Sequence, residues 1–313
     1  LCKTVLNQKP IWMIWGVLLL LAFVWGSSFI LMKIALFDSS GAPVYSPMDV
    51  AALRITIAAL SLLPVAISQF KNVPRKKWIW ILGVGTFGNL LPAYLFTSAQ
   101  TELPSAIAGM LNSLTPLFTM IIAVLLFKTA ISRSQLIGLV IGFFGAMLLI
   151  SDGGNLVDVF MSESGISIVG CRKVALATLF YGLSVNILRN KLLDVGATTI
   201  AAIALAFVMP IAVFALFGSD VPTILLENPS GIKSMLSVVV LAVIGTALAL
   251  AVFNALIKWT DALTASSVTY IIPVFAAMWG FIDGEALTVW HLIGGLVILL
   301  GVALVKRGSS GKK

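Results

Sequence analysis

The stretch Asn112-Ser113-Leu114-Thr115-Pro116-Leu117-Phe118 places a polar cluster and a proline in the middle of an apolar segment that runs from Pro104 to Phe127. A related pattern, Tyr270-Ile271-Ile272-Pro273-Val274-Phe275, follows at a displacement of 157 residues (273 − 116). Polar side chains and prolines are costly at membrane depth unless neighbouring helices or a wet cavity satisfy the freed groups. Two such segments, one in each half of the chain, are what a central solute site requires.

The composition is that of an integral membrane protein. Of the 313 residues, 60% are hydrophobic and 10% are charged, whereas roughly a quarter of the residues of a soluble domain are charged. No apolar run has the alternating pattern of a membrane β-barrel. The net charge of +8 comes from short basic clusters between apolar runs, which membrane topology explains better than nucleic-acid binding. We therefore expect an all-α, multi-pass protein of the cell (inner) membrane, in contact with lipid and not with nucleic acid.

Ten transmembrane helices fit the apolar runs. We expect them at Ile11–Leu36, Asp49–Gln69, Trp78–Ala99, Ser105–Phe127, Ser134–Ile150, Gly170–Leu188, Ala197–Phe217, Met235–Ile257, Ala265–Phe281 and Val289–Val305. The first is too long for a signal peptide and no small-residue cleavage site follows it, so we expect it to be retained. Most of the 20 Lys and Arg residues fall on one side of these spans, which predicts an N-in, C-in orientation. Cys2 and Cys171 then lie on opposite faces, and we expect no intramolecular disulfide.

The two halves of the chain repeat one another. Trp25-Gly26-Ser27-Ser28, with Lys33, returns 156 residues later (181 − 25) as Tyr181-Gly182-Leu183-Ser184, with Arg189. Gly85-Thr86 resembles Gly245-Thr246, and Ser132, Gly138 and Gly145 match Thr288, Gly294 and Gly301. Each half (11–150 and 166–306) holds five spans, an odd number, so the second enters the membrane upside down. Inverted repeats of this kind are typical of transporters that open alternately to the two faces.

These motifs resemble the drug/metabolite transporter superfamily, and within it the EamA-like ten-span transporters, aromatic amino acid and metabolite exporters among them. The resemblance covers nearly the whole chain and depends on the order and duplication of the motifs, including Leu53-Arg54, Gly284-Glu285 and Leu287-Thr288. It implies secondary transport, often outward, through a cavity lined by spans 1, 3, 4, 6, 8 and 9, with spans 5 and 10 set back. One departure is that the first half has Phe127-Lys128-Thr129 where the family usually has Gly-Glu, which removes the acid of an inner ion pair.

The candidate solute-binding residues are the polar and aromatic side chains that lie well inside these spans. They are Trp25, Ser28, Asn89, Tyr94, Asn112, Thr115, Tyr181, Ser184, Asn254, Thr269 and Tyr270. Aromatic walls with a few amides and hydroxyls suit a small zwitterionic or apolar solute. The alternative is structural, since Ser, Thr and Asn commonly join membrane helices by hydrogen bonds and deep aromatic residues commonly pack.

Lys33 and Arg54 are the basic residues within spans, each near the outer end. Arg54 follows Asp49 by five residues, so its side chain can extend to the outer interface. The other interpretation is a positive field that holds a carboxylate or phosphate on its way out.

The sequence gives little support for metal binding, cofactor binding or proton pumping. No His, Cys or carboxylate cluster has metal-ligand spacing, and there is no Walker-type loop, so we expect neither metal nor cofactor. No acid lies in the middle of a span, which favours facilitated diffusion or exchange over a proton pump. The favoured function is a non-enzymatic, alternating-access exporter of small metabolites, most of all amino acids, acting as a monomer or homodimer. The alternatives are a sugar-nucleotide or organophosphate exchanger and a membrane-embedded enzyme.

Overall fold

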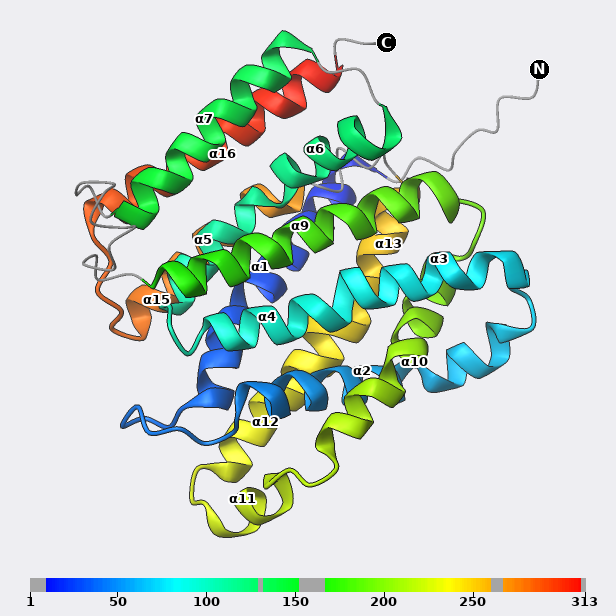
Figure 1. Ribbon diagram of the computed structural model, residues 1–313, viewed down its shortest axis with the longest axis vertical. Coiled ribbons are helices and arrows are strands. Elements are labelled where there is room, and N and C mark those ends of the chain that lie inside the picture. Colours follow the sequence, from blue (N-terminus) through cyan, green and yellow to red (C-terminus); the bar gives the residue numbers. More distant parts are fainter. Residues whose placement is uncertain (1–9, 129–131, 152–166, 260–266, 311–313) are drawn as a thin grey trace.

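The computed structural model describes residues 10–128, 132–151, 167–259 and 267–310 (Figure 1). Within these residues the chain is helical, with one isolated β-bridge between Phe37 and Pro43 and no named strand. The first half contains α1 (Ile11–Leu36), α2 (Pro47–Phe70), α3 (Arg75–Gly85), η1 (Thr86–Leu90), α4 (Leu91–Ala99), α5 (Ser105–Leu111), η2 (Asn112–Leu114), α6 (Thr115–Phe127) and α7 (Arg133–Ser151). The second contains α9 (Ile168–Lys191), α10 (Ala197–Leu216), α11 (Val221–Glu227), α12 (Gly231–Ala242), η3 (Val243–Leu248), α13 (Ala249–Trp259), η4 (Ser267–Tyr270), α15 (Ile272–Ile282) and α16 (Val289–Ser310).

The expected membrane spans are present. Eight helices are long and apolar enough to cross a membrane, and two shorter apolar helices, Ile272–Ile282 and Val289–Leu304, stand where the ninth and tenth spans are expected. Local chemistry sets several of the starts: the Ser46 and Ser167 side chains accept hydrogen bonds from the backbone N–H groups of Asp49 and Gly170, as N-caps do. The first part of the expected ninth span, residues 265 and 266, lies outside the described residues.

The proline in the fourth span interrupts the helix there. Pro116 has no N–H to donate to the carbonyl of Asn112, four residues earlier. The Thr115 hydroxyl donates to that carbonyl instead, at 2.8 Å, and Asn112–Leu114 form a 3₁₀ turn between α5 and α6. In the ninth span η4 likewise precedes the Pro273 helix α15. Both interruptions face the middle of the protein, as the sequence pattern predicts.

Spans 3 and 8 each contain a π-helical turn, η1 and η3, which was not expected. In each case a side chain of the turn bonds a carbonyl five residues earlier, in the preceding helix: Asn89 Nδ2 donates to Val84 O at 3.3 Å, and Thr246 Oγ1 donates to Leu241 O at 3.0 Å. The two bonds are related by a displacement of 157 (241 − 84 and 246 − 89). The match of Gly85-Thr86 to Gly245-Thr246, at 160, is therefore wrong by three residues, because chance Gly-Thr pairs in apolar helices look alike.

The repeats are interleaved, and their contacts repeat in inverted form. The first helix of each half packs on the third and fourth spans of the other: α1 on α12 and α15, and α9 on α3, α4 and α6. At one face Ser234 Oγ donates to Ile34 O at 2.9 Å, and at the other Lys77 Nζ donates to Lys191 O at 2.6 Å. These contacts are also related by 157 residues (234 − 77 and 191 − 34). Two inverted five-helix repeats are therefore confirmed.

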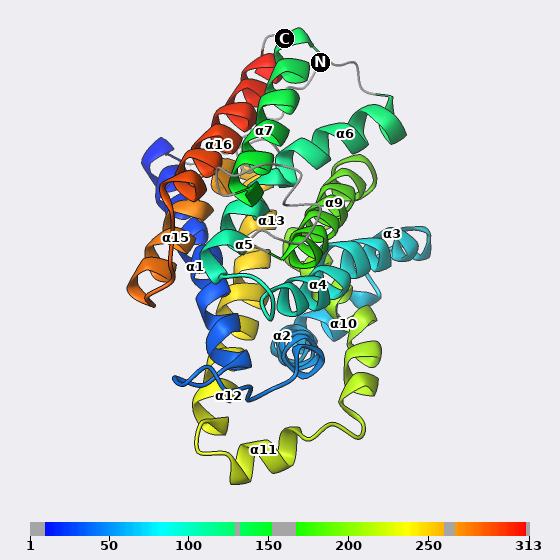
Figure 2. The same ribbon diagram turned by 60° about the vertical axis from the view of Figure 1, so that its left-hand side comes forward.

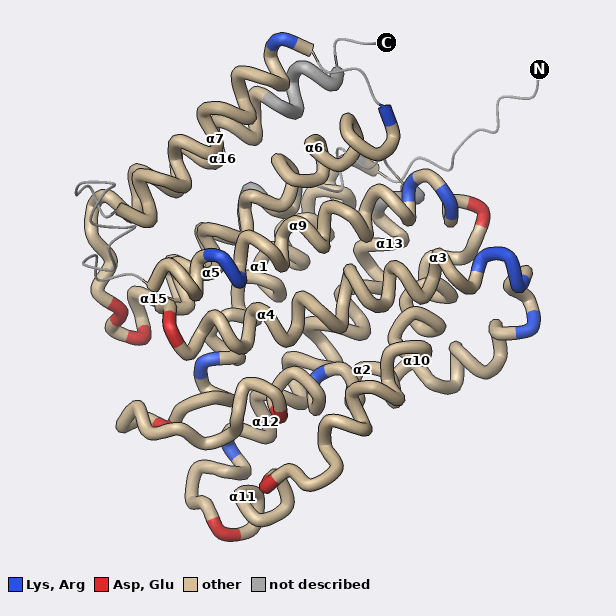
Figure 3. The backbone as a smooth tube through the Cα atoms, viewed as in Figure 1, with Lys and Arg blue, Asp and Glu red and all other residues tan. Residues whose placement is uncertain are grey.

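The arrangement leaves one helix pair apart from the rest. Figures 1 and 2 show α7 and α16, spans 5 and 10, side by side and away from α2, α10 and α12. In Figure 3 most Lys and Arg residues lie toward one end of the helices and most Asp and Glu residues toward the other. We call the acidic end, with Asp38 and Asp283, the outer face, and the end with the Arg75-Lys76-Lys77 cluster the inner face.

Candidate functional site

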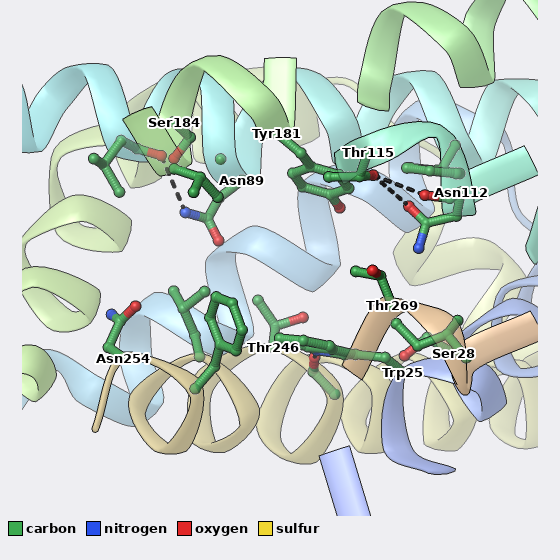
Figure 4. A pocket seen from close by; sticks show the side chains of 18 of the residues that line it. Trp25, Ser28, Asn89, Asn112, Thr115, Tyr181, Ser184, Thr246, Asn254 and Thr269 are labelled. Atoms are coloured by element: carbon green, nitrogen blue, oxygen red, sulfur yellow. Dashed lines mark hydrogen bonds between the residues drawn. The ribbon is translucent and has the colours of Figure 1, made fainter. Parts of the chain in front are cut away.

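A cavity of about 170 Å³ lies between the two repeats. Its lining residues come from α1, α2, all three elements of span 3 (α3, η1 and α4), span 4, α9, span 8 and span 9 (Figure 4). They are Trp25, Ser28, Phe29, Met32, Arg54, Val84, Gly88, Asn89, Phe96, Asn112, Thr115, Tyr181, Ser184, Val185, Leu188, Gly245, Thr246, Leu250, Phe253, Asn254, Thr269 and Ile272. The spans agree with those that the family resemblance implies, with Arg54 of span 2 in addition.

Two aromatic pairs form opposite walls of the cavity. Trp25 meets Phe253 edge-on at 5.0 Å between ring centroids, and Tyr181 stacks on Phe96 at 5.9 Å. The pairs are equivalent in the repeat, Trp25 with Tyr181 at 156 residues and Phe96 with Phe253 at 157 (253 − 96). Trp25 is further held by its Nε1–H, which donates to the Gly245 carbonyl in η3 at 3.1 Å. These walls provide flat apolar surface for an apolar or aromatic solute group.

The polar groups are arranged in equivalent pairs as well. Ser28 and Ser184 are buried at the positions where α1 and α9 approach Gly245 and Gly88 of the other repeat. Asn89 stands opposite Thr246, and Asn112 opposite Thr269. Among the described residues, Asn89 Oδ1 and Asn112 Nδ2 have no protein partner and turn into the cavity in Figure 4. They supply one acceptor and one donor for a solute.

Arg54 breaks this symmetry. Its guanidinium lines the cavity, where Nε donates to Thr246 Oγ1 at 2.9 Å and Nη1 lies 3.8 Å from Met32 Sδ. Position 210, the repeat equivalent at 156, is Pro210. The side chain therefore turns to the cavity and not to the outer interface, so the first of the two expectations for Arg54 does not hold.

Nine of the eleven candidate residues line the cavity, Tyr94 does not, and the side chain of Tyr270 is not described. Tyr94 packs against the cluster formed by α2, α3, α4 and α10. It lies five residues from Asn89, and on a helix of about 100° per residue five steps place it roughly 140° away. The backbone of Tyr270 belongs to η4, but its side chain lies outside the described part of the structure.

Lys33 lies beyond the cavity, at the outer face, where it closes the contact between spans 1 and 9. Its Nζ is 2.5 Å from Asp283 Oδ2 and 3.0 Å from Glu285 Oε1. Glu285 also accepts from the backbone N–H groups of Ser105 and Ala106, at 2.8 and 2.9 Å, at the N-terminus of α5. Burial raises the pKa of Glu285, but these hydrogen bonds and Lys33 outweigh burial and hold the pKa below its ordinary value.

Sequence reasoning missed several residues of the site. Phe96 and Phe253 are apolar residues in apolar spans and carry no signal of their own. The sequence singles out Thr246 only as part of the pair Gly245-Thr246, which resembles Gly85-Thr86. Once the repeat is aligned at 157 residues, it becomes the counterpart of Asn89, which is the signal that would have found it.

An all-α membrane protein with inverted repeats around a central cavity is a secondary-transporter architecture. The model of the EamA-like transporter family matches residues 11–151 and 169–307, and the chain belongs to this family. It is therefore a transporter and a multi-pass protein of the inner membrane.

The chain is also similar to individual members and to a solved structure. It is 24% identical over 299 residues to a "Probable amino-acid metabolite efflux pump" of Salmonella typhimurium, covering 91% of each chain. It is 27% identical over 302 residues to the "Uncharacterized inner membrane transporter YedA" of Escherichia coli, covering 94% of this chain and 91% of that one. A crystal structure aligns with a TM-score of 0.59 at 17% identity, over 97% of this chain and 100% of the other, which supports the fold.

Proposed function

We propose that the protein moves small metabolites, amino acids most of all, out of the cell by alternating access, without catalysing a reaction. The observation that carries the proposal is the cavity built from equivalent residues of two inverted repeats. Exchanging the conformations of the two repeats opens such a site to the opposite face. The repeats 11–150 and 166–306 are the units that move, and Trp25, Tyr181, Asn89, Asn112 and their neighbours hold the solute.

The outer contact supports a cycle with an outwardly closed state. Lys33, Glu285 and the start of α5 join spans 1, 4 and 9 on the outer face. By the repeat, the inner positions equivalent to Lys33 and Glu285 are Arg189 and Thr129, and Thr129 lies outside the described residues. The inner pair of residues therefore lacks the acid of the outer pair. The relative from Salmonella typhimurium, which aligns over 91% of each chain, is named a "Probable amino-acid metabolite efflux pump", and this name is in keeping with export.

A sugar-nucleotide or organophosphate exchanger is the second candidate. A phosphate dianion is usually held by several cations, whereas Arg54 is the one Lys or Arg that lines the described cavity. This makes the small-metabolite function the better supported of the two.

The test is counterflow in proteoliposomes, with the purified protein loaded in turn with the twenty amino acids, several sugars and several organic phosphates. We expect uptake driven by at least one amino acid. Leu250→Trp fills the cavity, and we expect it to abolish uptake, whereas Leu248→Trp places the same ring on an exposed position (52%) of the same span and keeps it. Uptake that is lost equally in both variants, or seen only with organic phosphates, contradicts the proposal. Strong dependence on an imposed pH gradient would contradict exchange as the mode of transport.

A further inference from the structure

We infer that Arg54 and Thr246 form a carboxylate subsite at the outer end of the cavity, and that the cargo is a monocarboxylate with an apolar or aromatic body. The inference rests on the proposed function and names the substrate class for its site. It depends on how the guanidinium is held, on what surrounds it and on its single occurrence.

The Arg54 guanidinium is fixed in direction. Thr246 Oγ1 accepts from Arg54 Nε at 2.9 Å and donates its own proton to Leu241 O at 3.0 Å. Because the hydroxyl donates to a backbone carbonyl just before the π-turn η3, it is oriented by the backbone and not by rotation in solvent. With Nε held on this side, the Nη edge of the guanidinium is directed away from Thr246. An edge with two parallel N–H groups matches the two oxygens of a carboxylate.

No counter-ion neutralises Arg54 within the described part of the chain. Its protein partners there are Thr246 and Met32, and neither is charged. Asp283 and Glu285 pair with Lys33 instead. A partly buried cation without an anion is costly, and a solute carboxylate in the cavity reduces that cost.

The subsite occurs once, although the cavity is two-fold. The two aromatic pairs are equivalent to each other in the repeat, as are the two serines, and Asn89 is equivalent to Thr246. The position equivalent to Arg54 is Pro210. A solute that binds here is therefore held in one orientation, with its carboxylate toward Arg54 and its body between Trp25 and Tyr181. A single guanidinium balances a monoanion, so a carboxylate fits better than a phosphate dianion.

The first experiment measures binding to the purified protein in detergent, through its thermal melting with four probes: phenylalanine, 3-phenylpropionate, phenylalaninamide and phenylphosphonate. We expect both carboxylates to bind at least about tenfold more tightly than the amide. Equal binding of acid and amide, failure of both carboxylates to bind, or binding of phenylphosphonate about tenfold better than either carboxylate overturns the assignment.

Variants then assign the effect to the residue. Arg54→Gln is expected to reduce the acid-to-amide preference to less than about threefold, and Arg54→Lys to restore part of it, since the ammonium keeps the charge without the fork. Arg133→Gln makes the same change at the exposed start of α7 and is expected to keep the preference. If Arg54→Gln does not fold, Thr246→Val, which leaves the guanidinium unoriented, is expected to weaken acid binding several-fold and leave the amide unchanged. If folded Arg54→Gln or Thr246→Val protein keeps the full acid-to-amide preference, the proposal is contradicted.

Counterflow with the same compounds separates this inference from the transport function. Preference for carboxylates in binding without any counterflow leaves the subsite in place and removes transport. Counterflow of acid and amide alike leaves transport in place and removes the subsite.

Discussion

At the scale of single residues, Gly26 is where α1 can least accept a side chain. A Cβ at this position would lie 2.5 Å from Phe275 Cβ and 3.0 Å from Ile272 O of span 9. Its repeat equivalent Gly182 meets the backbone of Thr119 and Phe118 in span 4 in the same way, at 2.8 and 3.0 Å. Small residues permit this close approach of membrane helices, and the approach places Trp25 and Ser28 at the cavity.

We therefore expect Gly26→Ala to destabilise the protein by about 1–3 kcal/mol, the usual cost of an added methyl group in packed surroundings. Gly16→Ala is the matched control in the same helix, because nothing lies within 4 Å of a Cβ there, and it should be neutral or slightly stabilising. Melting temperatures of the two variants in one detergent check this. Equal shifts would show that the crossing of α1 and span 9 tolerates a side chain.

At the scale of elements, Glu285 holds three spans together at the outer face. Its side chain, 4% exposed, accepts from Lys33 and from the first two N–H groups of α5. The carboxylate is thus placed at the positive end of a helix as well as beside a cation. Its pKa is lowered, with burial opposing and the hydrogen bonds and Lys33 prevailing.

The sign of the pH dependence follows from the lowered pKa. Stability from Glu285 is complete above the unfolded-state pKa, about 4.5, and is lost as pH falls from there through the lower folded-state pKa. We expect Glu285→Gln to cost about 1.5–3 kcal/mol at neutral pH, and the gap in melting temperature from the unmodified protein to narrow below pH 4.5. Glu227→Gln, an exposed acid at the end of α11, is the control and should change little. A gap that is independent of pH would refute the role of the ionised carboxylate.

The ion pair and the π-turns also mark the limit of prediction from sequence at this scale. The helices and their order follow from composition, and the breaks at Pro116 and Pro273 follow from a proline next to polar residues, since α2 and α10 continue through Pro64 and Pro210. A π-turn shifts every later side chain by one position and no residue pattern announces it, so the faces of spans 3 and 8 that carry Asn89 and Thr246 could not be predicted from helical periodicity. The partners of Lys33, Asp283 and Glu285, lie 250 and 252 residues away (283 − 33 and 285 − 33), and a single sequence does not show which loop meets which helix.

At the scale of the whole molecule, inverted topology makes equivalent loops lie on opposite faces. The loop after the second span contains Asn72, and the loop after the seventh contains Asn228, the same residue type at a displacement of 156. The charges agree with this assignment: Lys71 and the Arg75-Lys76-Lys77 cluster surround the first, and Asp220 and Glu227 precede the second. Since basic segments remain on the cytoplasmic side, Asn72 is expected inside and Asn228 outside.

Cysteine labelling in intact cells tests this expectation with one substitution made twice. In a background with Cys2→Ser and Cys171→Ser, a membrane-impermeant maleimide should label Asn228→Cys from outside at once. Asn72→Cys, although its side chain is exposed in the structure, should be labelled only after the membrane is permeabilised. The reverse pattern would invert the orientation of the whole transporter and with it the positions of Arg54 and Glu285. Labelling of both positions from the same side would refute the inverted repeat, because two parallel repeats place equivalent loops on one face.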